Sequence, residues 1–160
     1  MSFLYQLSLT LHNITRWVVL ILAIIVLVQS IIGWLGKKTY TDQNRKLAGA
    51  YGGFFDLEIL LGLILFFVAG WGKTLINGGS QVMSNPASRF FAVEHWMIML
   101  LAAIVLHIGS SKVKNSNTSH KKFRNSFIWY GVSLLLVLAA IPWPGMATAR
   151  PLLRLFGLIF

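Results

Sequence analysis

The 160-residue sequence contains no cysteine and few acidic residues. The absence of cysteine excludes disulfide bonds, thiolate-bound zinc, cysteine-held iron–sulfur clusters and covalently attached c-type haem. Aspartate and glutamate together number four, against 14 lysines and arginines, so the formal net charge is +10. Charged residues of both signs make up only 11% of the chain, whereas roughly 25% is usual in soluble domains.

Apolar residues take the place of the missing charges. They make up 56% of the sequence, and the mean hydropathy is +0.71. They are concentrated in four stretches, each near the ~20 residues that cross ~30 Å of hydrocarbon. These expected spans cover approximately residues 9–35, 47–71, 90–109 and 127–141. The pattern predicts one all-α transmembrane domain, residues 1–160, folded as an up-down four-helix bundle.

The basic residues lie mainly in two connections, after the first and third expected spans. They are Lys37, Lys38, Arg45, Lys46, Lys112, Lys114, Lys121, Lys122 and Arg124. Loops rich in lysine and arginine stay in the cytoplasm. We therefore expect both termini on the outer side of a bacterial inner membrane, with the basic loops cytoplasmic. The positive charge orients the chain and is not an indication of nucleic-acid binding.

Two segments outside the spans are less regular. Residues 72–88 are rich in glycine, asparagine and serine, which predicts an irregular connection. Pro142 and Pro144 end the fourth span, because proline cannot continue a helix. The apolar tail that follows, residues 143–160, contains Arg150 and Arg154. We expect this tail to lie at the membrane interface as an amphipathic helix, or to dock on a partner subunit.

Two histidines are the first candidates for chemistry. A rise of ~1.5 Å per residue places His12 and His95 at similar depth, in the outer third of spans one and three. Ionisable residues inside a span are costly and are functional candidates. Two imidazoles at matched depth suit a haem iron with two axial histidines. Interhelical hydrogen bonding, a non-haem metal and a quinone contact remain alternatives. Ala102 and Ala103 follow His95 at helical spacing and predict a shallow wall for a flat macrocycle.

Other polar residues of the spans extend this hypothesis. Arg16 lies one turn below His12 and needs a negative partner, which a haem propionate or Glu94 would supply. Glu58 lies near the middle of the membrane, and His107 lies about 18 Å below His95. Both are candidates for proton relay or quinone contact, with polar packing between helices as the alternative. His107 has no histidine partner near the inner ends of the other spans, so we expect no second haem.

Glycine is frequent in the second span, where it predicts close helix approach. The glycines concerned are Gly49, Gly52, Gly53 and Gly62. No nucleophile–base–acid set and no phosphate-binding glycine loop is present in the sequence, so no catalytic residue is assigned.

The residues around the two histidines resemble a known group of proteins. Arg89…His95-Trp is similar to the signature that begins haem-bearing spans of membrane b-type cytochromes. His12-Asn-Ile-Thr-Arg16-Trp resembles a stretch of short bacterial four-helix proteins described as cytochrome b-like. The resemblance covers spans one to three, and it implies one haem b with His12 and His95 as axial ligands. It also implies Arg16 and Arg89 as propionate contacts.

The sequence therefore favours a haem b-binding membrane protein that carries electrons as a subunit of a respiratory or redox complex. Expected partners are the lipid bilayer, other membrane subunits and quinone. The alternative is a cofactor-free accessory subunit that packs against a larger membrane complex.

Overall fold

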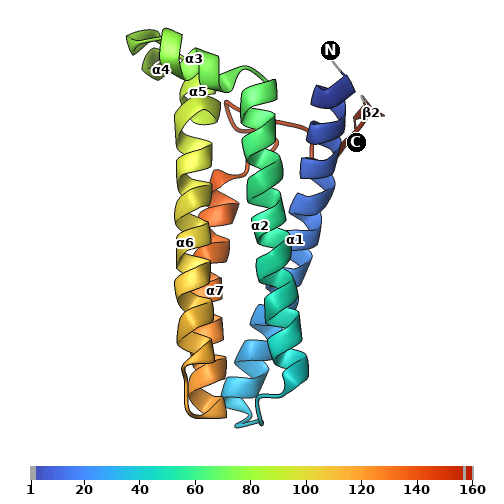
Figure 1. The fold of residues 1–160 in the computed structure, drawn as a ribbon, viewed down its shortest axis with the longest axis vertical. Coiled ribbons are helices and arrows are strands. Elements are labelled where there is room, and N and C mark those ends of the chain that lie inside the picture. Colours follow the sequence, from blue (N-terminus) through green and yellow to red (C-terminus); the bar gives the residue numbers. More distant parts are fainter. Residues whose placement is uncertain (1–2, 157, 160) are drawn as a thin grey trace.

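The computed structural model describes residues 3–156, 158 and 159, and helices dominate this part of the chain. Four helical stretches within it are long and apolar enough to cross a membrane. They are α1 (Phe3–Leu35), α2 (Asp42–Val68), the continuous stretch Pro86–Lys114 and α7 (Ser119–Ala140). Figure 1 shows them side by side with alternating direction. Their length and composition indicate a multi-pass membrane protein and confirm the predicted helical bundle.

α2 and α7 begin at polar residues that precede the predicted apolar stretches. α2 begins at Asp42, where the Thr41 N–H donates to the Asn44 side chain at 2.9 Å. α7 begins after Thr118, whose hydroxyl accepts a bond from the Lys121 N–H at 3.3 Å. These side chains satisfy backbone groups that a helix end leaves unpaired. Hydropathy marks only the apolar part of each helix, so the predicted spans are shifted or shorter.

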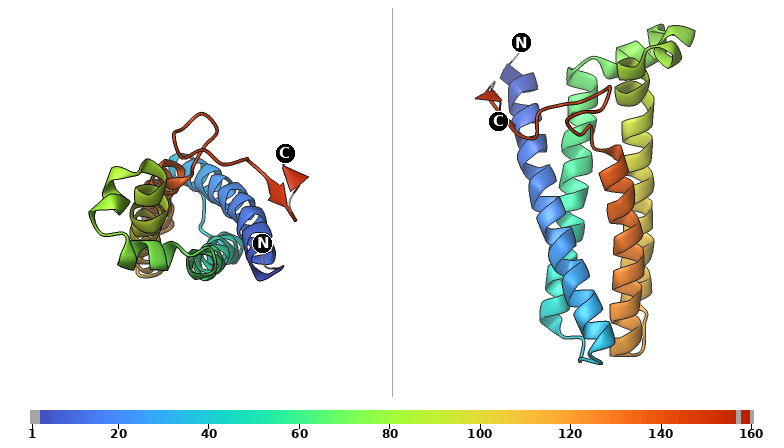
Figure 2. Two further views of the ribbon diagram at one scale, coloured as in Figure 1. Left: turned by 90° about the horizontal axis from the view of Figure 1, so that it is seen from above. Right: turned by 180° about the vertical axis from the view of Figure 1, so that it is seen from behind.

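The helices form a ring in which α1 and α6 (His95–Lys114) lie diagonally. α2 and α7 each pack against both of them, and the view along the bundle in Figure 2 shows this order. α6 and α7 pack most closely. The Ser133 hydroxyl donates to the Ala102 carbonyl at 2.9 Å, and a Cβ at Gly109 would lie 2.4 Å from the Cβ of Trp129. α2 packs against α6 much less extensively.

The two ends of the bundle differ in structure. One end, called here the basic end, carries the short connections at residues 36–41 and 115–118. The opposite end, called here the tail end, carries the start of α1, the α2–α6 connection and the tail. Every residue expected to bind a cofactor lies in the half of the bundle that includes the tail end.

The α2–α6 connection is helical, and the prediction of an irregular segment at residues 72–88 is wrong. It contains α3 (Trp71–Asn77), α4 (Ser80–Ser84) and α5 (Pro86–Arg89). Gly70 (φ 84°) and Gly79 (φ 49°) reverse the chain in the left-handed backbone region that glycine accepts without strain. The turn-forming residues therefore cap short helices instead of producing a loop.

A π-helical turn, η1 (Phe90–Glu94), joins α5 to α6. The backbone N–H of His95 donates to the carbonyl of Phe90, five residues earlier. Such single π turns hold more residues than an α turn and are frequent at functional sites. His95 is the first residue after this turn.

The tail crosses the tail end of the bundle from α7 to α1 (Figure 2). Strands β1 (Arg154–Leu155) and β2 (Leu158–Ile159) pair antiparallel, with Leu155 opposite Leu158. The expectation of an amphipathic helix is wrong, because the described part of residues 143–160 contains turns and these two strands. The tail packs on its own bundle: the Trp17 indole donates to the Leu152 carbonyl at 2.9 Å.

Candidate functional site

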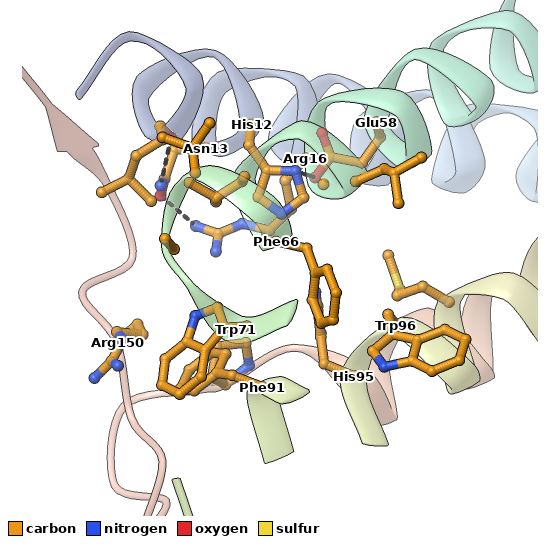
Figure 3. A pocket seen from close by; sticks show the side chains of 18 of the residues that line it. His12, Asn13, Arg16, Glu58, Phe66, Trp71, Phe91, His95, Trp96 and Arg150 are labelled. Carbon is orange, nitrogen blue, oxygen red and sulfur yellow. Dashed lines mark hydrogen bonds and ion pairs between the residues drawn. The ribbon is translucent and has the colours of Figure 1, made fainter. Parts of the chain in front are cut away.

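A cavity of about 810 Å³ lies among α1, α2 and α6 at the tail end. Small-molecule and cofactor sites span roughly 300–1,000 Å³. The cavity follows from the loose packing of α2 against α6, and residues of α3, η1 and the tail complete its lining. Four aromatic side chains form much of its apolar wall (Figure 3): Phe66, Trp71, Phe91 and Trp96.

The cavity brings His12 and His95 together from diagonal helices. Their ring centroids are 6.4 Å apart, and the ring planes are inclined at 84°. Figure 3 shows His12 extending from α1 and His95 from α6 toward each other. Matched depth along two helices does not determine in which direction their side chains point. The approach of the two rings therefore follows from the order of the helices around the bundle.

The α7 C-terminus orients His95. Its Nδ1 lies 2.8 Å from the Ala140 carbonyl oxygen, and Ala140 is the last residue of α7. Carbonyls at a helix C-terminus lack a partner within the helix. Because a carbonyl only accepts, Nδ1 of His95 carries the hydrogen and Nε2 carries the lone pair.

Two residues of α2 position His12. Its Nδ1 lies 3.1 Å from Oε1 of Glu58, whose side chain is only 2% exposed. Gly62 leaves room for the ring, since a Cβ there would lie 3.2 Å from Cε1 of His12. Both Glu58 oxygens are buried, and within the described residues neither accepts a hydrogen bond of good geometry. The structure thus pairs Glu58 with His12, a contact that the sequence did not predict.

The two imidazoles share one pattern of contacts. In each ring Nδ1 lies near a carboxylate or carbonyl oxygen, and no residue of the described chain forms a hydrogen bond with Nε2 of His12 or His95. A histidine that binds a metal through one nitrogen almost always donates its other N–H to such an acceptor. Each ring therefore has an oxygen beside Nδ1 and an Nε2 that no described residue occupies, an arrangement that suits a metal ligand.

Three arginines line the cavity: Arg16, Arg150 and Arg154. Arg16 donates to Asn13 at 3.2 Å and to the Leu152 carbonyl, and Arg150 lies over the Phe91 ring, 4.6 Å from its centroid. No carboxylate of the described residues lies within ion-pair distance of any of the three. The cavity therefore has an excess of positive charge and suits a ligand that carries carboxylates.

Arg150 and Arg154 were not among the residues predicted to bind a cofactor. Their sequence signal is weak, because they lie in a tail whose path across the bundle is set by contacts with α1. Proline and arginine at residues 150–154 indicate a polar break after the fourth span. They do not indicate that the tail crosses the bundle to pack against the first half of α1.

Three residues named from the sequence lie elsewhere. Arg89 donates to Glu94 at 2.7 Å and does not line the cavity. Glu94, considered above as a partner for Arg16, is paired with Arg89 instead. His107 contacts Asp56, with Nε2 2.8 Å from Oδ1, outside the cavity.

The expected alanine wall is wrong as well. Ala102 is fully buried and Ala103 is 8% exposed, and neither lines the cavity. Ala102 serves the close packing of α6 on α7, where its carbonyl accepts the Ser133 hydrogen bond. Met99 and Leu100 are the α6 residues that line the cavity below His95 and Trp96.

Fold and cavity together define a four-span helical membrane protein with two histidines facing each other in a cofactor-sized cavity. Comparison with known proteins finds no matching protein family, no matching curated protein and no matching solved structure.

Proposed function

We propose that the protein binds one b-type haem between His12 and His95 and carries electrons as a subunit of a membrane redox complex. The ring separation of 6.4 Å is the observation that supports this proposal most directly. A metal–imidazole bond of ~2.0 Å, plus ~1 Å from nitrogen to ring centre, separates two opposed imidazole centroids by about 6 Å.

The number of available ligands favours haem over a bare metal ion. The described residues contain no group of three or more histidine, cysteine, aspartate or glutamate side chains that would hold a metal. A protein site for a bare ion such as zinc uses at least three side chains. A macrocycle brings four nitrogen ligands of its own and needs only the two axial histidines from the protein.

The other lining residues fit the remaining parts of haem. Arg16, Arg150 and Arg154 would bind the propionates by charge-assisted hydrogen bonds. The aromatic wall would cover the apolar faces of the ring. When bound, the haem supplies one-electron exchange at its iron. The chain holds the two imidazoles through Glu58 and the Ala140 carbonyl.

The place of the site supports a role within a complex. The positive-inside rule assigns the basic end to the cytoplasm of a bacterial inner membrane and the cavity to the outer half of the bilayer. One haem near one face does not carry electrons across the membrane. We therefore propose that it exchanges them with another subunit or with a membrane quinone.

A reduced-minus-oxidised absorption spectrum of the purified protein tests this function. We expect the sharp α-band of a low-spin haem, lost in both His12→Ala and His95→Ala. The matched controls His107→Ala and His120→Ala change histidines outside the cavity and should keep the band. A flat spectrum with full haem supply would refute haem binding and would favour the accessory subunit without a cofactor.

A further inference from the structure

Two glycines of α2 are not covered by any described part of the chain. Gly49 and Gly53 are four residues apart and share one face of the helix. A Cβ at either position would meet no heavy atom of the described residues within 4 Å. In contrast, a Cβ at Gly52 would lie 3.7 Å from Leu106, and one at Gly62 would lie 3.2 Å from His12. Close helix approach within the chain explains Gly52 and Gly62 but leaves Gly49 and Gly53 unexplained.

An acid–base pair lies beside these glycines. Asp56 is three residues beyond Gly53 and shares its side of α2. Its Oδ1 lies 2.8 Å from Nε2 of His107 on α6, and both side chains are 54% exposed. Asp56 is ten residues beyond Lys46, and at ~1.5 Å per residue this places it about 15 Å into the bundle. An ionisable pair at that depth therefore faces acyl chains.

This exposure is unusual for a membrane helix. Ionisable residues within spans almost always face protein or a water-filled cavity, because hydrocarbon offers them no hydrogen bonds. Small residues that let backbones approach, together with polar residues that bond across helices, are the features of helix–helix interfaces in membranes. The face defined by Gly49, Gly53, Asp56 and His107, called here the glycine face, combines both features.

We propose that the glycine face binds a second copy of this chain. The argument for a copy is charge complementarity under two-fold symmetry. Asp56 and His107 form an acceptor–donor pair within one chain, and a two-fold axis that brings two such pairs together places each carboxylate beside the imidazole of the other copy. The apolar continuation of the face, Leu60 and Ile64, is 53% and 39% exposed and would lie along the same contact.

The charges around the glycine face allow this packing. Lys46 lies three residues before Gly49 on the same side of α2, and its long side chain reaches the headgroups at the basic end. Arg45 is paired with Asp42 at 3.2 Å. Helices that cross at a Gly-x-x-x-Gly contact diverge from it at about 40°, so the two Lys46 side chains separate. The proposal is independent of haem binding.

Single-molecule photobleaching in lipid vesicles tests the proposal. The chain has no cysteine, so a dye on Asn117→Cys in the α6–α7 connection reports every copy. We expect two-step bleaching that persists on dilution in lipid. Gly53→Leu should lower the dimer affinity at least ten-fold and leave the fold intact, because its side chain would enter open space. Ala139→Leu, an exposed small-to-large change on the diagonal helix α7, should leave the affinity unchanged.

Oxidative crosslinking locates the contact. Gly49→Cys should form a disulfide dimer, whereas Leu135→Cys on α7, at a position 67% exposed, should not. Asp56→Ala should weaken association, and Asp56→Asn, which keeps an acceptor for His107, should restore part of it. Single-step bleaching at every protein-to-lipid ratio would overturn the proposal. Equal association of wild type and Gly53→Leu, or equal crosslinking at positions 49 and 135, would also overturn it.

Discussion

The orientation of His12 depends on two single residues of α2. Glu58 lies 3.1 Å from Nδ1 of the ring, and Gly62 leaves the space that Cε1 occupies. His95 instead depends on a backbone carbonyl, that of Ala140. Side-chain substitution therefore acts directly on the contacts of His12 and only indirectly on the hydrogen bond of His95.

Gly62→Ala tests the close approach to His12. The added Cβ would lie 3.2 Å from Cε1 of the ring, so the ring must move by a few tenths of an ångström. We expect haem content per protein to fall several-fold in a pyridine haemochrome assay. Gly131→Ala on α7, whose Cβ would lie 3.7 Å from Leu27 in ordinary contact and outside the cavity, should leave haem content unchanged. Equal haem content in both variants would show that the ring position is not critical.

Glu58→Ala tests the second contact of His12. Loss of a residue that orients a metal-bound histidine typically costs 10–100-fold in affinity. Titration of the haem-free protein should show a shift of this size. Glu58→Gln, which keeps an oxygen acceptor near Nδ1, should recover part of the loss. If Glu58→Gln is as weak as Glu58→Ala, the charge of Glu58 matters and the hydrogen-bond acceptor does not.

At the scale of elements, uneven packing between neighbours creates the cavity. α6 and α7 approach closely at Gly109 and Ala102, while α2 stays away from α6 at the tail end. The tail then covers the opening and is held by α1 through Trp17 and Thr10. The closest contact in the bundle is therefore between α6 and α7, and the cavity lies between α2 and α6.

Gly109→Ala tests the α6–α7 contact. Its Cβ would lie 2.4 Å from the Cβ of Trp129, and a helix backbone must shift to admit it. We expect the free energy of unfolding, measured in mixed micelles of increasing denaturing detergent, to fall by about 1–3 kcal/mol. Gly131→Ala on α7 should be neutral or slightly stabilising, since its Cβ would lie 3.7 Å from Leu27 in ordinary contact and alanine favours helix over glycine. An unchanged Gly109→Ala protein would mean that α6 and α7 do not pack this closely.

Substitution of the two tail arginines tests whether the tail is part of the haem-binding site. Arg150→Gln combined with Arg154→Gln removes two cations that line the cavity. We expect haem transfer to excess apomyoglobin to become about ten-fold faster, because charge-assisted bonds to propionates are lost. Lys73→Gln on α3 changes a cation that does not line the cavity and should have the wild-type rate. Equal rates of haem transfer for wild type and both variants would show that the tail is not part of the binding site.

At the scale of the whole molecule, one end of the bundle carries the basic connections and the other carries the cavity. The orientation of the chain in the membrane can be tested directly, because the chain has no cysteine and only an introduced one would react with a maleimide. A membrane-impermeant maleimide should label Ser80→Cys in α4 from outside intact cells. Asn117→Cys at the basic end should react only after the membrane is opened, because lysine-rich loops stay in the cytoplasm. The reverse pattern would place the cavity on the cytoplasmic side.

The sequence was sufficient for the four spans, because apolar length alone decides what crosses a bilayer. It also predicted His12 and His95 at one depth, since depth follows from residue count along a helix. It could not predict helix rotation or neighbour order. These determine that Glu58 contacts His12, and that Ala102 faces α7 instead of the cavity. The path of the tail depends on long-range contacts, so Arg150 and Arg154 were missed.

The π turn before His95 has a consequence for how the site tolerates insertions and deletions. A π turn bonds each N–H to the carbonyl five residues back, one residue more than an α turn. Deleting Val93 would convert the turn to a regular α-helix and leave α6 and His95 in register. Because the extra residue is absorbed within this one turn, the segments on either side of it, including the Trp71–Phe91 stack at 5.2 Å, would keep their phase relative to His95. A one-residue deletion in the regular part of α6 would instead rotate everything before it by about 100° around the helix axis.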